Sequence, residues 1–303
     1  MIYVTCNLCG HDDYKVRFPA TIDGDMQAVV DAFRCTSPGY GHHPQIVECR
    51  RCGHVYANPR WAADDLLGAY TAVEDEVYVA ERQGRELTFR KHLQAMEAYT
   101  GAGNGRKLLD VGAYIGVFVD VAKQAGWDAC GLEPSEWAAK LAQQHNLNVV
   151  QGTQDTAPFS NSTFDVITMW DVIEHVSDPN HEIHRAHELL KPGGWLVIHT
   201  MDIDSLMARL MGSRWPWLMD MHIHYFSQKT LGQMLTQNGF EVAWSGAQGR
   251  YLRLNYLADR LRAFSRPLGT VATALINGLK LNHIAVPVNF GDLFTVYARK
   301  IGN

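Results

Sequence analysis

The sequence predicts an α/β fold, with a mostly parallel β-sheet covered by helices on both faces. Three observations support this prediction. Between residues 107 and 200, short apolar runs typical of buried strands alternate with segments of helical periodicity. Turn signals separate these runs, the clearest being Pro192-Gly193-Gly194. The length of 303 residues suits one α/β core with added segments better than one small domain.

The individual elements follow from the same patterns. Helices are predicted at residues 62–72 and 79–100, and we expect them to cap a pocket before the flexible joint Gly101-Ala102-Gly103-Asn104-Gly105. Strands are predicted at residues 107–111, 128–133, 148–151, 164–170, 195–200, 240–245 and 293–299. The helices between them are predicted at residues 116–125, 135–145, 179–190 and 228–238, the last with Ser227 as its N-cap. The final strand is expected to pair antiparallel with the sixth and to complete a seven-stranded sheet.

Residues 246–290 are predicted to form an insertion between the last two strands. Its first part predicts an amphipathic helix with arginines on the opposite face, from the apolar residues Leu252, Leu254, Tyr256, Leu257, Leu261 and Phe264. The apolar run from Leu268 to Val288 includes Lys280 and His283, so we do not expect it to span a membrane. We interpret this run as a buried packing helix. The alternative is a surface that contacts a lipid-linked substrate or a second subunit.

The most informative stretch follows the first predicted strand. An apolar run ends at Asp110, the chain turns through Gly112 and Gly116, and Glu133 closes the next apolar run. This order is typical of a βαβ unit that binds the ribose of a nucleoside cofactor. A dinucleotide loop would need more glycines, and Asp110 at the helix entrance would repel a pyrophosphate but attract an ammonium or a sulfonium. The pattern therefore favours S-adenosylmethionine.

From residue 107 to about residue 245, the chain resembles the class I S-adenosylmethionine-dependent methyltransferases, whose sheet is Rossmann-like and seven-stranded. The order and spacing of these motifs carry the resemblance: Leu109-Asp110-Val111-Gly112 with Gly116, Glu133-Pro134-Ser135, Ala157-Pro158-Phe159 before Ser162-Thr163-Phe164-Asp165-Val166-Ile167, Trp170-Asp171-Val172-Ile173-Glu174-His175-Val176, and Leu190-Lys191-Pro192-Gly193-Gly194-Trp195-Leu196-Val197-Ile198. The chain departs from the family at Tyr114, where most members have a third glycine.

The resemblance assigns cofactor contacts to the carboxyl ends of the first two strands, where ligands of such sheets bind. It implies that Asp110 binds the methionine amino group, directly or through water. It also implies that Glu133 holds both ribose hydroxyls, and that Gly112 and Gly116 let the chain pass close to the cofactor. Tyr114 is expected either to project over the methionine end of the cofactor or to be a packing residue.

The resemblance leaves the adenine contact open. The family usually has an acidic residue directly after the glycine that follows the third strand, but here Gly152 is followed by a threonine. Gln154 and Asp155 are the substitutes we expect. Trp170 and Asp171 end the fourth strand and are expected close to the methyl donor.

Two short cysteine motifs near the N-terminus predict a metal site. They are Cys6-Asn7-Leu8-Cys9-Gly10-His11 and Cys49-Arg50-Arg51-Cys52-Gly53-His54. Each pair is a knuckle in which two thiolates face one ion and the glycine permits a tight turn, so Cys6, Cys9, Cys49 and Cys52 are expected to bind a structural zinc ion. A redox dithiol and a disulfide are the alternatives. Cys35 and Cys130 are expected to be ordinary buried residues.

Three histidines are candidates for the base that accepts a proton from the methyl acceptor. His175 follows the fourth strand, and His222 and His224 lie in the loop after the fifth strand, which crosses the pocket mouth in this fold. We favour His222 or His224, although each of the three histidines could instead be structural. The preceding stretch, residues 206–219, is rich in Met and Trp and is interpreted as either a substrate lid or core packing.

The charge balance argues against nucleic acid as a partner. The formal net charge is −5, and residues 1–60 hold equal numbers of basic and acidic side chains. Counterion release would therefore contribute little affinity for a phosphate backbone. The start of the chain has no secretory pattern and runs directly into the cysteine motif, so we expect a cytoplasmic enzyme.

Together these observations predict three regions: a zinc ribbon at residues 1–60, a helical cap at 61–105 and a methyltransferase domain at 106–303. The ribbon followed by this domain resembles a bacterial family often associated with sugar and polysaccharide modification. We expect O-methylation of a sugar or another hydroxylated small molecule, either free or linked to a lipid. The alternatives are an RNA methyltransferase that uses the ribbon for recognition, and a non-catalytic partner subunit with a cofactor fold. The sequence leaves the oligomeric state open.

Overall fold

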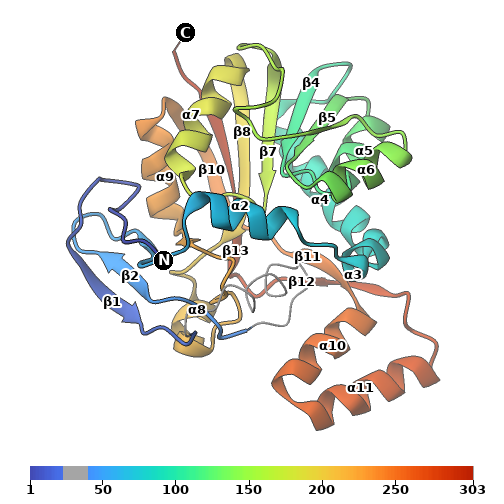
Figure 1. Ribbon diagram of the computed structural model, residues 1–303. Coiled ribbons are helices and arrows are strands. Elements are labelled where there is room, and N and C mark those ends of the chain that lie inside the picture. Colours follow the sequence, from blue (N-terminus) through green and yellow to red (C-terminus); the bar gives the residue numbers. More distant parts are fainter. Residues whose placement is uncertain (23–39, 303) are drawn as a thin grey trace.

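Figure 1 shows the computed structural model, which describes residues 1–22 and 40–302. A seven-stranded sheet with the order β10-β13-β8-β7-β4-β5-β6 lies at its centre. The strands are β4 (Lys107–Val111), β5 (Asp128–Glu133), β6 (Val149–Gln151), β7 (Phe164–Trp170), β8 (Leu190–Met201), β10 (Phe240–Ala247) and β13 (Leu293–Lys300). The strands from β4 to β8 are parallel, and β13 pairs antiparallel with both β8 and β10. The predicted sheet and its antiparallel edge are confirmed.

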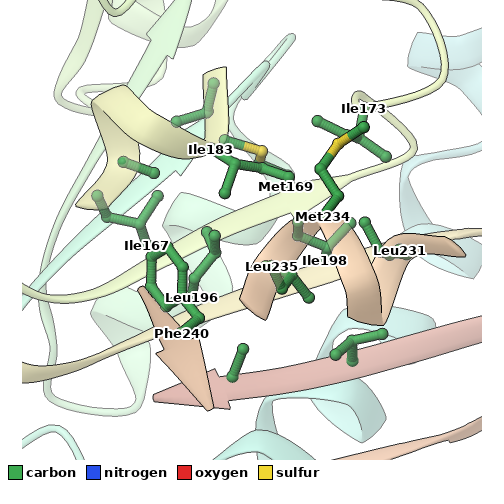
Figure 2. Close-up of a cluster of buried hydrophobic side chains, with 14 of the residues drawn as sticks. Ile167, Met169, Ile173, Ile183, Leu196, Ile198, Leu231, Met234, Leu235 and Phe240 are labelled. Carbon is green, nitrogen blue, oxygen red and sulfur yellow. The ribbon is translucent and has the colours of Figure 1, made fainter. Parts of the chain in front are cut away.

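Helices cover both faces of this sheet. One face carries α7 (Pro179–Leu189) and α9 (Gln228–Gln237), and the other carries α4 (Arg82–Thr100), α5 (Val117–Gln124) and α6 (Glu136–Gln144). Figure 2 shows the packing on the first face, where side chains of α7 and α9 meet those of β7 and β8. Full burial of each aliphatic side chain contributes about 1.5–3 kcal/mol, so these two layers hold the sheet and its strand ends in place.

The helical cap differs from the prediction in one respect. α2 (Ala63–Thr71) lies where it was expected, but the long helix is divided into α3 (Glu76–Ala80) and α4, with Glu81 between them. The carboxylate of Asp75 accepts a hydrogen bond from the backbone N–H of Tyr78 and so caps α3. The Glu81 side chain accepts hydrogen bonds from Arg253, and this contact ties the break between the helices to the insertion.

The N-terminal segment forms a second sheet with the order β1-β2-β3-β9. Its strands are β1 (Tyr14–Phe18), β2 (Ile46–Cys49), β3 (Val55–Ala57) and β9 (His224–Tyr225). β9 belongs to the loop between β8 and α9, which also contains the short helix α8 (Leu206–Met211). Strand pairing therefore joins the cysteine segment directly to the main domain. Cys35 lies outside the described residues.

The prediction for the insertion was partly wrong. A hairpin of β11 (Arg250–Arg253) and β12 (Ala285–Val288) frames two helices, α10 (Leu254–Phe264) and α11 (Arg266–Gly278). Leu268, Val271 and Leu275 of α11 are 60%, 58% and 60% exposed, so α11 is not the buried packing helix that its composition suggested. The physical reason is that α11 packs mainly against α10 and projects from the rest of the molecule (Figure 1). Within the described ranges, no helix is both long and apolar enough to span a bilayer.

Candidate active site

A cavity of about 520 Å³ opens at the carboxyl ends of the central strands. Its wall combines residues from the strand ends with residues from α2, α4, the loop before β9 and the β11–β12 hairpin. This is the position at which parallel α/β sheets bind their ligands, because the loops that leave the strands on either side of the switch in strand order diverge there. The cavity is lined by part of the predicted site: Gly112, Tyr114, Gln154, Trp170, Asp171, His175 and His222.

Asp110 ends β4 beneath this cavity. The side chain is 3% exposed, and one carboxylate oxygen accepts a hydrogen bond of 2.7 Å from the Thr168 hydroxyl on neighbouring β7. Burial raises the pKa of Asp110 to about 8, against the hydrogen bond from Thr168, which lowers it. The cavity wall itself is formed here by the next residues, Val111 and Gly112. A cation placed above this turn would stabilise the ionised form of Asp110.

Glu133 ends β5 and is fully buried. Its two carboxylate oxygens accept hydrogen bonds from the backbone N–H of Tyr114 at 2.9 Å and of Ser135 at 2.8 Å. The Tyr70 hydroxyl of α2 donates a third, longer bond of 3.4 Å. Burial raises the pKa of Glu133 to about 7, although all three donors favour the carboxylate. The two backbone N–H groups fix the carboxylate in one orientation behind the cavity wall, which is formed here by Leu132, Pro134, Tyr70 and Tyr114.

The two glycines of the motif have different roles. Gly112 has a φ of +71° and lines the cavity, and a Cβ at this position would lie 2.5 Å from a methyl group of Val172. Gly116 has a φ of +73°, and a Cβ there would lie 2.8 Å from Leu147. Gly116 thus allows the start of α5 to pack on the chain that follows α6, and it does not line the cavity. The expectation that both glycines pass close to the cofactor therefore fits Gly112 only.

Tyr114 occupies the position of the third glycine with a φ of +48°, in the left-handed region. Its ring packs edge-on against Tyr78, with ring centres 4.4 Å apart, and is tilted against Trp137 at 5.9 Å. The residue also lines the cavity. The position of Tyr114 is thus compatible with both expected roles, as a cofactor contact and as a packing residue, since its ring packs in an aromatic cluster at the cavity wall.

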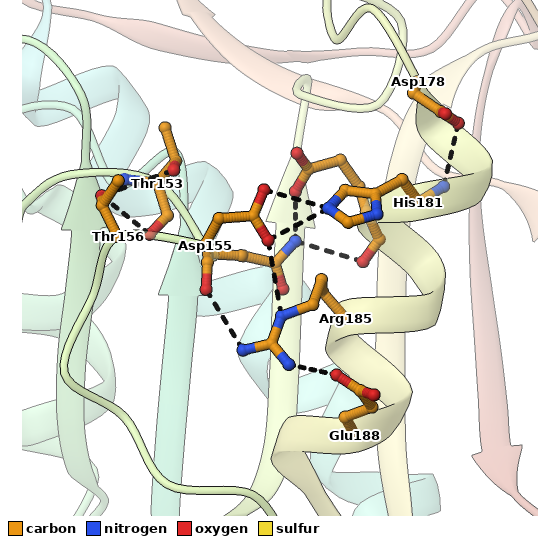
Figure 3. Close-up of polar contacts among 9 residues, drawn as sticks. Thr153, Asp155, Thr156, Asp178, His181, Arg185 and Glu188 are labelled. Carbon is orange, nitrogen blue, oxygen red and sulfur yellow. Dashed lines mark hydrogen bonds and ion pairs between the residues drawn. The ribbon is translucent and has the colours of Figure 1, made fainter.

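Of the two expected adenine contacts, only Gln154 lines the cavity. Its side-chain N–H donates to the carbonyl of Glu182, and its Oε1 is buried without a hydrogen-bond partner among the described residues. Asp155 points elsewhere, as Figure 3 shows: its carboxylate pairs with His181 at 3.0 Å and with Arg185 at 3.6 Å, both on α7. The suggestion of Asp155 as an adenine contact was wrong, because its carboxylate is half exposed, pairs with these two side chains of α7 and does not line the cavity.

Trp170 and Asp171 both line the cavity at the end of β7, as expected. Arg250 of the β11–β12 hairpin donates a hydrogen bond of 3.1 Å to Asp171, and the Asp171 carboxylate lies 4.0 Å from Nε2 of His199. Burial raises the pKa of Asp171, but the surrounding basic groups, with Arg250 the strongest of them, together hold the pKa of that carboxyl below its usual value. Burial lowers the pKa of His199 to about 3 and that of His92 to about 4, so both rings are neutral near pH 7.

His175 and His222 come together on one wall of the cavity, with ring centres 4.8 Å apart. Nδ1 of His175 lies 2.9 Å from the carbonyl oxygen of Met221, and Nδ1 of His222 lies 2.7 Å from that of Trp217. The side chain of Glu174 is close to both rings, and one ligand atom from each of the three residues lies within 4.8 Å of the others. Burial lowers the pKa of both histidines, whereas burial and the Asp171 carboxylate raise that of Glu174 to about 8.

His224 does not line the cavity. Its Nδ1 lies 3.0 Å from Nε2 of His54, and its Nε2 accepts a hydrogen bond of 2.9 Å from Arg60. The Arg60 guanidinium also donates to the carbonyl of Ser177. His224 was therefore wrong as a candidate base, because it is a buried structural residue between the cysteine segment and the main domain.

The Trp-rich stretch divides between the two roles considered for it. Trp215 is 1% exposed and packs in a core cluster under α8, whereas Trp217 lines the cavity beneath the Arg250 guanidinium. Both indole N–H groups donate to the same Asp292 oxygen, at 3.2 and 2.9 Å. Only Pro216, Trp217 and Met219 of this stretch reach the cavity.

The four motif cysteines come together as predicted. Their sulfur atoms all lie within 4.8 Å of one another, and the pairs Cys6–Cys52 and Cys9–Cys49 are each separated by 3.5 Å. These separations are far beyond a disulfide bond of about 2.05 Å and match the spacing of thiolates around one tetrahedral ion. Gly10 and Gly53 have φ values of +73° and +79°, as the turn of each knuckle requires.

The polar cavity residues that sequence reasoning missed include His92, His199 and Arg250. His199 left a signal, because it interrupts an otherwise apolar strand close to its carboxyl end. His92 is one of many polar residues on α4, and Arg250 lies in a hairpin that was not predicted. Nothing in their spacing connects these two residues with the motifs of the central sheet.

Comparisons with known proteins agree with this geometry. A family model described as "Methyltransferase domain" matches residues 80–243. A relative named ubiquinone biosynthesis O-methyltransferase from Bordetella avium is 27% identical over 171 residues, which are 52% of this chain and 70% of that protein. A protein of the same name from Leptothrix cholodnii is 29% identical over 41% of this chain and 57% of its own length. The chain thus spans only part of these curated relatives.

Two solved structures show the same fold. A methyltransferase in complex with an activator protein from Haloferax volcanii has a TM-score of 0.55 and 13% identity, and the match covers 80% of this chain and 99% of that chain. A Thermotoga maritima methyltransferase has a TM-score of 0.50 and 21% identity, with 74% and 93% covered. The family match takes in more than half of the chain, and the sheet order is the one expected for that family. The chain therefore belongs to the class I S-adenosylmethionine-dependent methyltransferases.

Proposed function

We propose that this methyltransferase O-methylates a hydroxylated small molecule. The observation that carries this proposal is the polar end of the cavity, where Glu174, His175 and His222 face one space beside Trp170 and Asp171. Such groups can bind a hydroxyl and remove its proton, which a weakly acidic acceptor requires. The relatives named O-methyltransferases support the same acceptor atom.

The cofactor would bind where β4 and β5 end. Asp110 and Gly112 would face the methionine amino group, and Glu133 would accept hydrogen bonds from the ribose hydroxyls in place of the Tyr70 phenol. The orphaned Oε1 of Gln154 is the acceptor that the exocyclic amine of adenine needs, because a buried polar atom without a partner is costly. The residues present thus fit S-adenosylmethionine at all three of its polar parts.

The chemistry requires alignment and the removal of one proton. S-adenosylmethionine would supply a methyl group on a positively charged sulfur, which an acceptor oxygen would displace as a neutral thioether. The acceptor hydroxyl gives up its proton to the His175 and His222 end of the cavity or to water. The aromatic wall of Trp170 and Trp217 excludes water from the methyl group.

We further propose that the four cysteines hold a structural zinc ion. A segment with so few strands cannot bury much core of its own, and zinc bound by four thiolates would supply the missing stability. The ion would not take part in methyl transfer, since the cysteines are not among the residues that line the cavity. It would act by keeping β3 in place for its pairing with β9.

The cavity wall and the sequence resemblance support a proposal for the acceptor. This wall is largely apolar with a few convergent polar groups, as is common for small-molecule sites. We propose a sugar or another hydroxylated metabolite, which the flat face of Trp217 could support. Residues 1–22 and 40–60 fold into a sheet attached to the domain, which favours a supporting role for this segment over recognition of RNA.

Transfer of labelled methyl from S-adenosylmethionine into separate fractions of glycans and nucleotide sugars, lipids, RNA and protein tests this proposal. Label is expected in a small-molecule or glycan fraction and should disappear with the Asp110→Ala variant. Label in RNA alone would contradict the proposal. Absence of label from every fraction, despite binding of S-adenosylhomocysteine, would contradict it as well and would favour a non-catalytic role.

A further inference from the structure

We propose that Glu174, His175 and His222 bind a divalent metal ion, which in turn binds two neighbouring hydroxyl oxygens of the acceptor. This inference rests on the proposed O-methylation and names the chemical class of its acceptor. One carboxylate oxygen and two imidazole nitrogens come within 4.8 Å of one another at the cavity wall. A metal ion with bonds of about 2.0–2.2 Å to each group fits among three such atoms after small side-chain movements.

The two imidazole rings are held in the orientation that a metal ligand needs. Nδ1 of His175 and Nδ1 of His222 each face a backbone carbonyl oxygen, of Met221 and Trp217, at 2.9 and 2.7 Å. A carbonyl only accepts, so each Nδ1 carries the hydrogen and each Nε2 has a free lone pair. Metal-binding histidines show this arrangement, in which the second nitrogen donates to a carbonyl that fixes the ring.

The Glu174 carboxylate also has few hydrogen-bond partners within the protein. Glu174 is 1% exposed, and its Oε2 accepts a hydrogen bond of 2.9 Å from the Thr200 hydroxyl. Its own backbone N–H is a second donor, and the remaining acceptor capacity of the carboxylate is available to a metal ion. Arg250, whose charge acts on Glu174, pairs directly with Asp171 at 3.1 Å. A metal ion at the cluster would therefore complete the coordination of Glu174.

The ligand set indicates which ions would bind. Two imidazoles and one carboxylate suit first-row divalent ions such as manganese, iron or zinc, and three protein ligands leave coordination positions open. Two adjacent hydroxyl oxygens of a diol or a catechol can fill two of these positions. The ion would lower the pKa of the bound hydroxyl, whose proton leaves to water, and the resulting oxygen anion attacks the methyl carbon. In this arrangement His175 and His222 hold the metal and are not themselves the base.

Manganese is a suitable probe because thiolates select zinc over Mn²⁺, so the cysteine cluster will not compete for it. Protein that carries one equivalent of zinc is titrated with Mn²⁺, and the free ion is followed by electron paramagnetic resonance. Wild type is expected to bind one Mn²⁺, and His175→Gln and His222→Gln are expected to weaken binding by at least about tenfold. His181→Gln, a replacement on the surface of α7, is the matched control and should bind like wild type. Equal Mn²⁺ binding in all variants, or none in wild type at millimolar concentration, would overturn the proposal.

A second measurement keeps the test valid for variants that fail to fold. The pulsed electron paramagnetic resonance spectrum of the wild-type Mn²⁺ complex should show nitrogen couplings from imidazole. Their absence would overturn the proposed metal site. Binding of S-adenosylhomocysteine by each variant reports that the fold is intact. Methylation of a hydroxyl at full rate in both histidine variants would refute the metal site and leave the proposed O-methylation standing. Mn²⁺ bound at the three residues, with methylation on nitrogen or carbon only, would support the ion site and refute the O-methylation.

Discussion

Asp110 is expected to make cofactor binding depend on pH. Its carboxyl group is buried, and burial raises its pKa to about 8, so most molecules of the free protein carry a proton there at pH 7. The ammonium group of the cofactor binds a carboxylate far better than a neutral carboxylic acid. Binding near neutral pH must therefore release the proton from Asp110, and the protonated molecules are the ones that bind poorly.

The size of this effect follows from the ionised fraction. Below the pKa, that fraction rises about tenfold for each pH unit, and the apparent dissociation constant falls in inverse proportion. Affinity for S-adenosylhomocysteine, which keeps the ammonium group, is thus expected to rise about tenfold from pH 6 to pH 7. Glu133, whose pKa burial raises to about 7, would steepen this rise wherever ribose binding needs its carboxylate.

Isothermal titration calorimetry measures both the affinity and the proton released. In buffers with different ionisation enthalpies, binding to wild type at pH 7 should release close to one proton. The Asp110→Asn variant keeps the shape of the side chain and the contact with Thr168, but it should bind more weakly and lose its share of the pH dependence. Affinity that stays constant between pH 6 and pH 7 in wild type, or an unchanged slope in the variant, would refute the reasoning.

Other predictions test the remaining parts of the site. Gln154→Ala should weaken binding of S-adenosylhomocysteine by about two- to tenfold, because one hydrogen bond is lost. Asp155→Ala should leave the affinity unchanged. Equal effects of the two substitutions in calorimetry would contradict this prediction. Gly112→Ala should destabilise the fold by roughly 1–3 kcal/mol in urea unfolding, because φ is +71° and a Cβ would meet a side-chain carbon at 2.5 Å. Gly232→Ala, in a helix with open space around it, is the control and should not destabilise. Removal of zinc, or the Cys49→Ser substitution, should lower the melting temperature and should reduce kcat more than it reduces cofactor affinity. If cofactor affinity fell more than kcat, the proposal that zinc supports only the acceptor end of the cavity would be contradicted.

The cofactor end of the site could be predicted because its residues lie within short, continuous motifs. Asp110 and Glu133 each follow an apolar strand, and parallel strands bring their carboxyl ends to one edge of the sheet. The same logic found the sheet and its helices, since buried strands and amphipathic helices leave clear periodicities. Gln154 and Asp155 could not be separated, because adjacent loop residues point in directions that only their partners on α7 decide.

The acceptor end depends on contacts between distant segments. His222 and His224 are two residues apart, yet one lines the cavity and the other packs on His54, because β9 pairs with β3 from the start of the chain. No local pattern contains that pairing. The apolar residues of α11 led to the wrong prediction of a buried helix, since composition alone cannot distinguish a buried helix from a projecting one.

The pairing of β3 with β9 gives the cysteine segment a physical connection to the chemistry. The loop between β8 and α9 must bring His222 to the cavity, and a long loop without anchors would lose much conformational entropy on doing so. Tyr56 pairs with His224 in the strand ladder, and Arg60 bonds both His224 and Ser177, which follows the Glu174-His175 segment. The Glu174-His175 segment and the loop that carries His222 thus both contact the sheet of the cysteine segment. With the proposed zinc ion bound, this sheet would fix the two histidine-bearing segments at the acceptor end of the cavity.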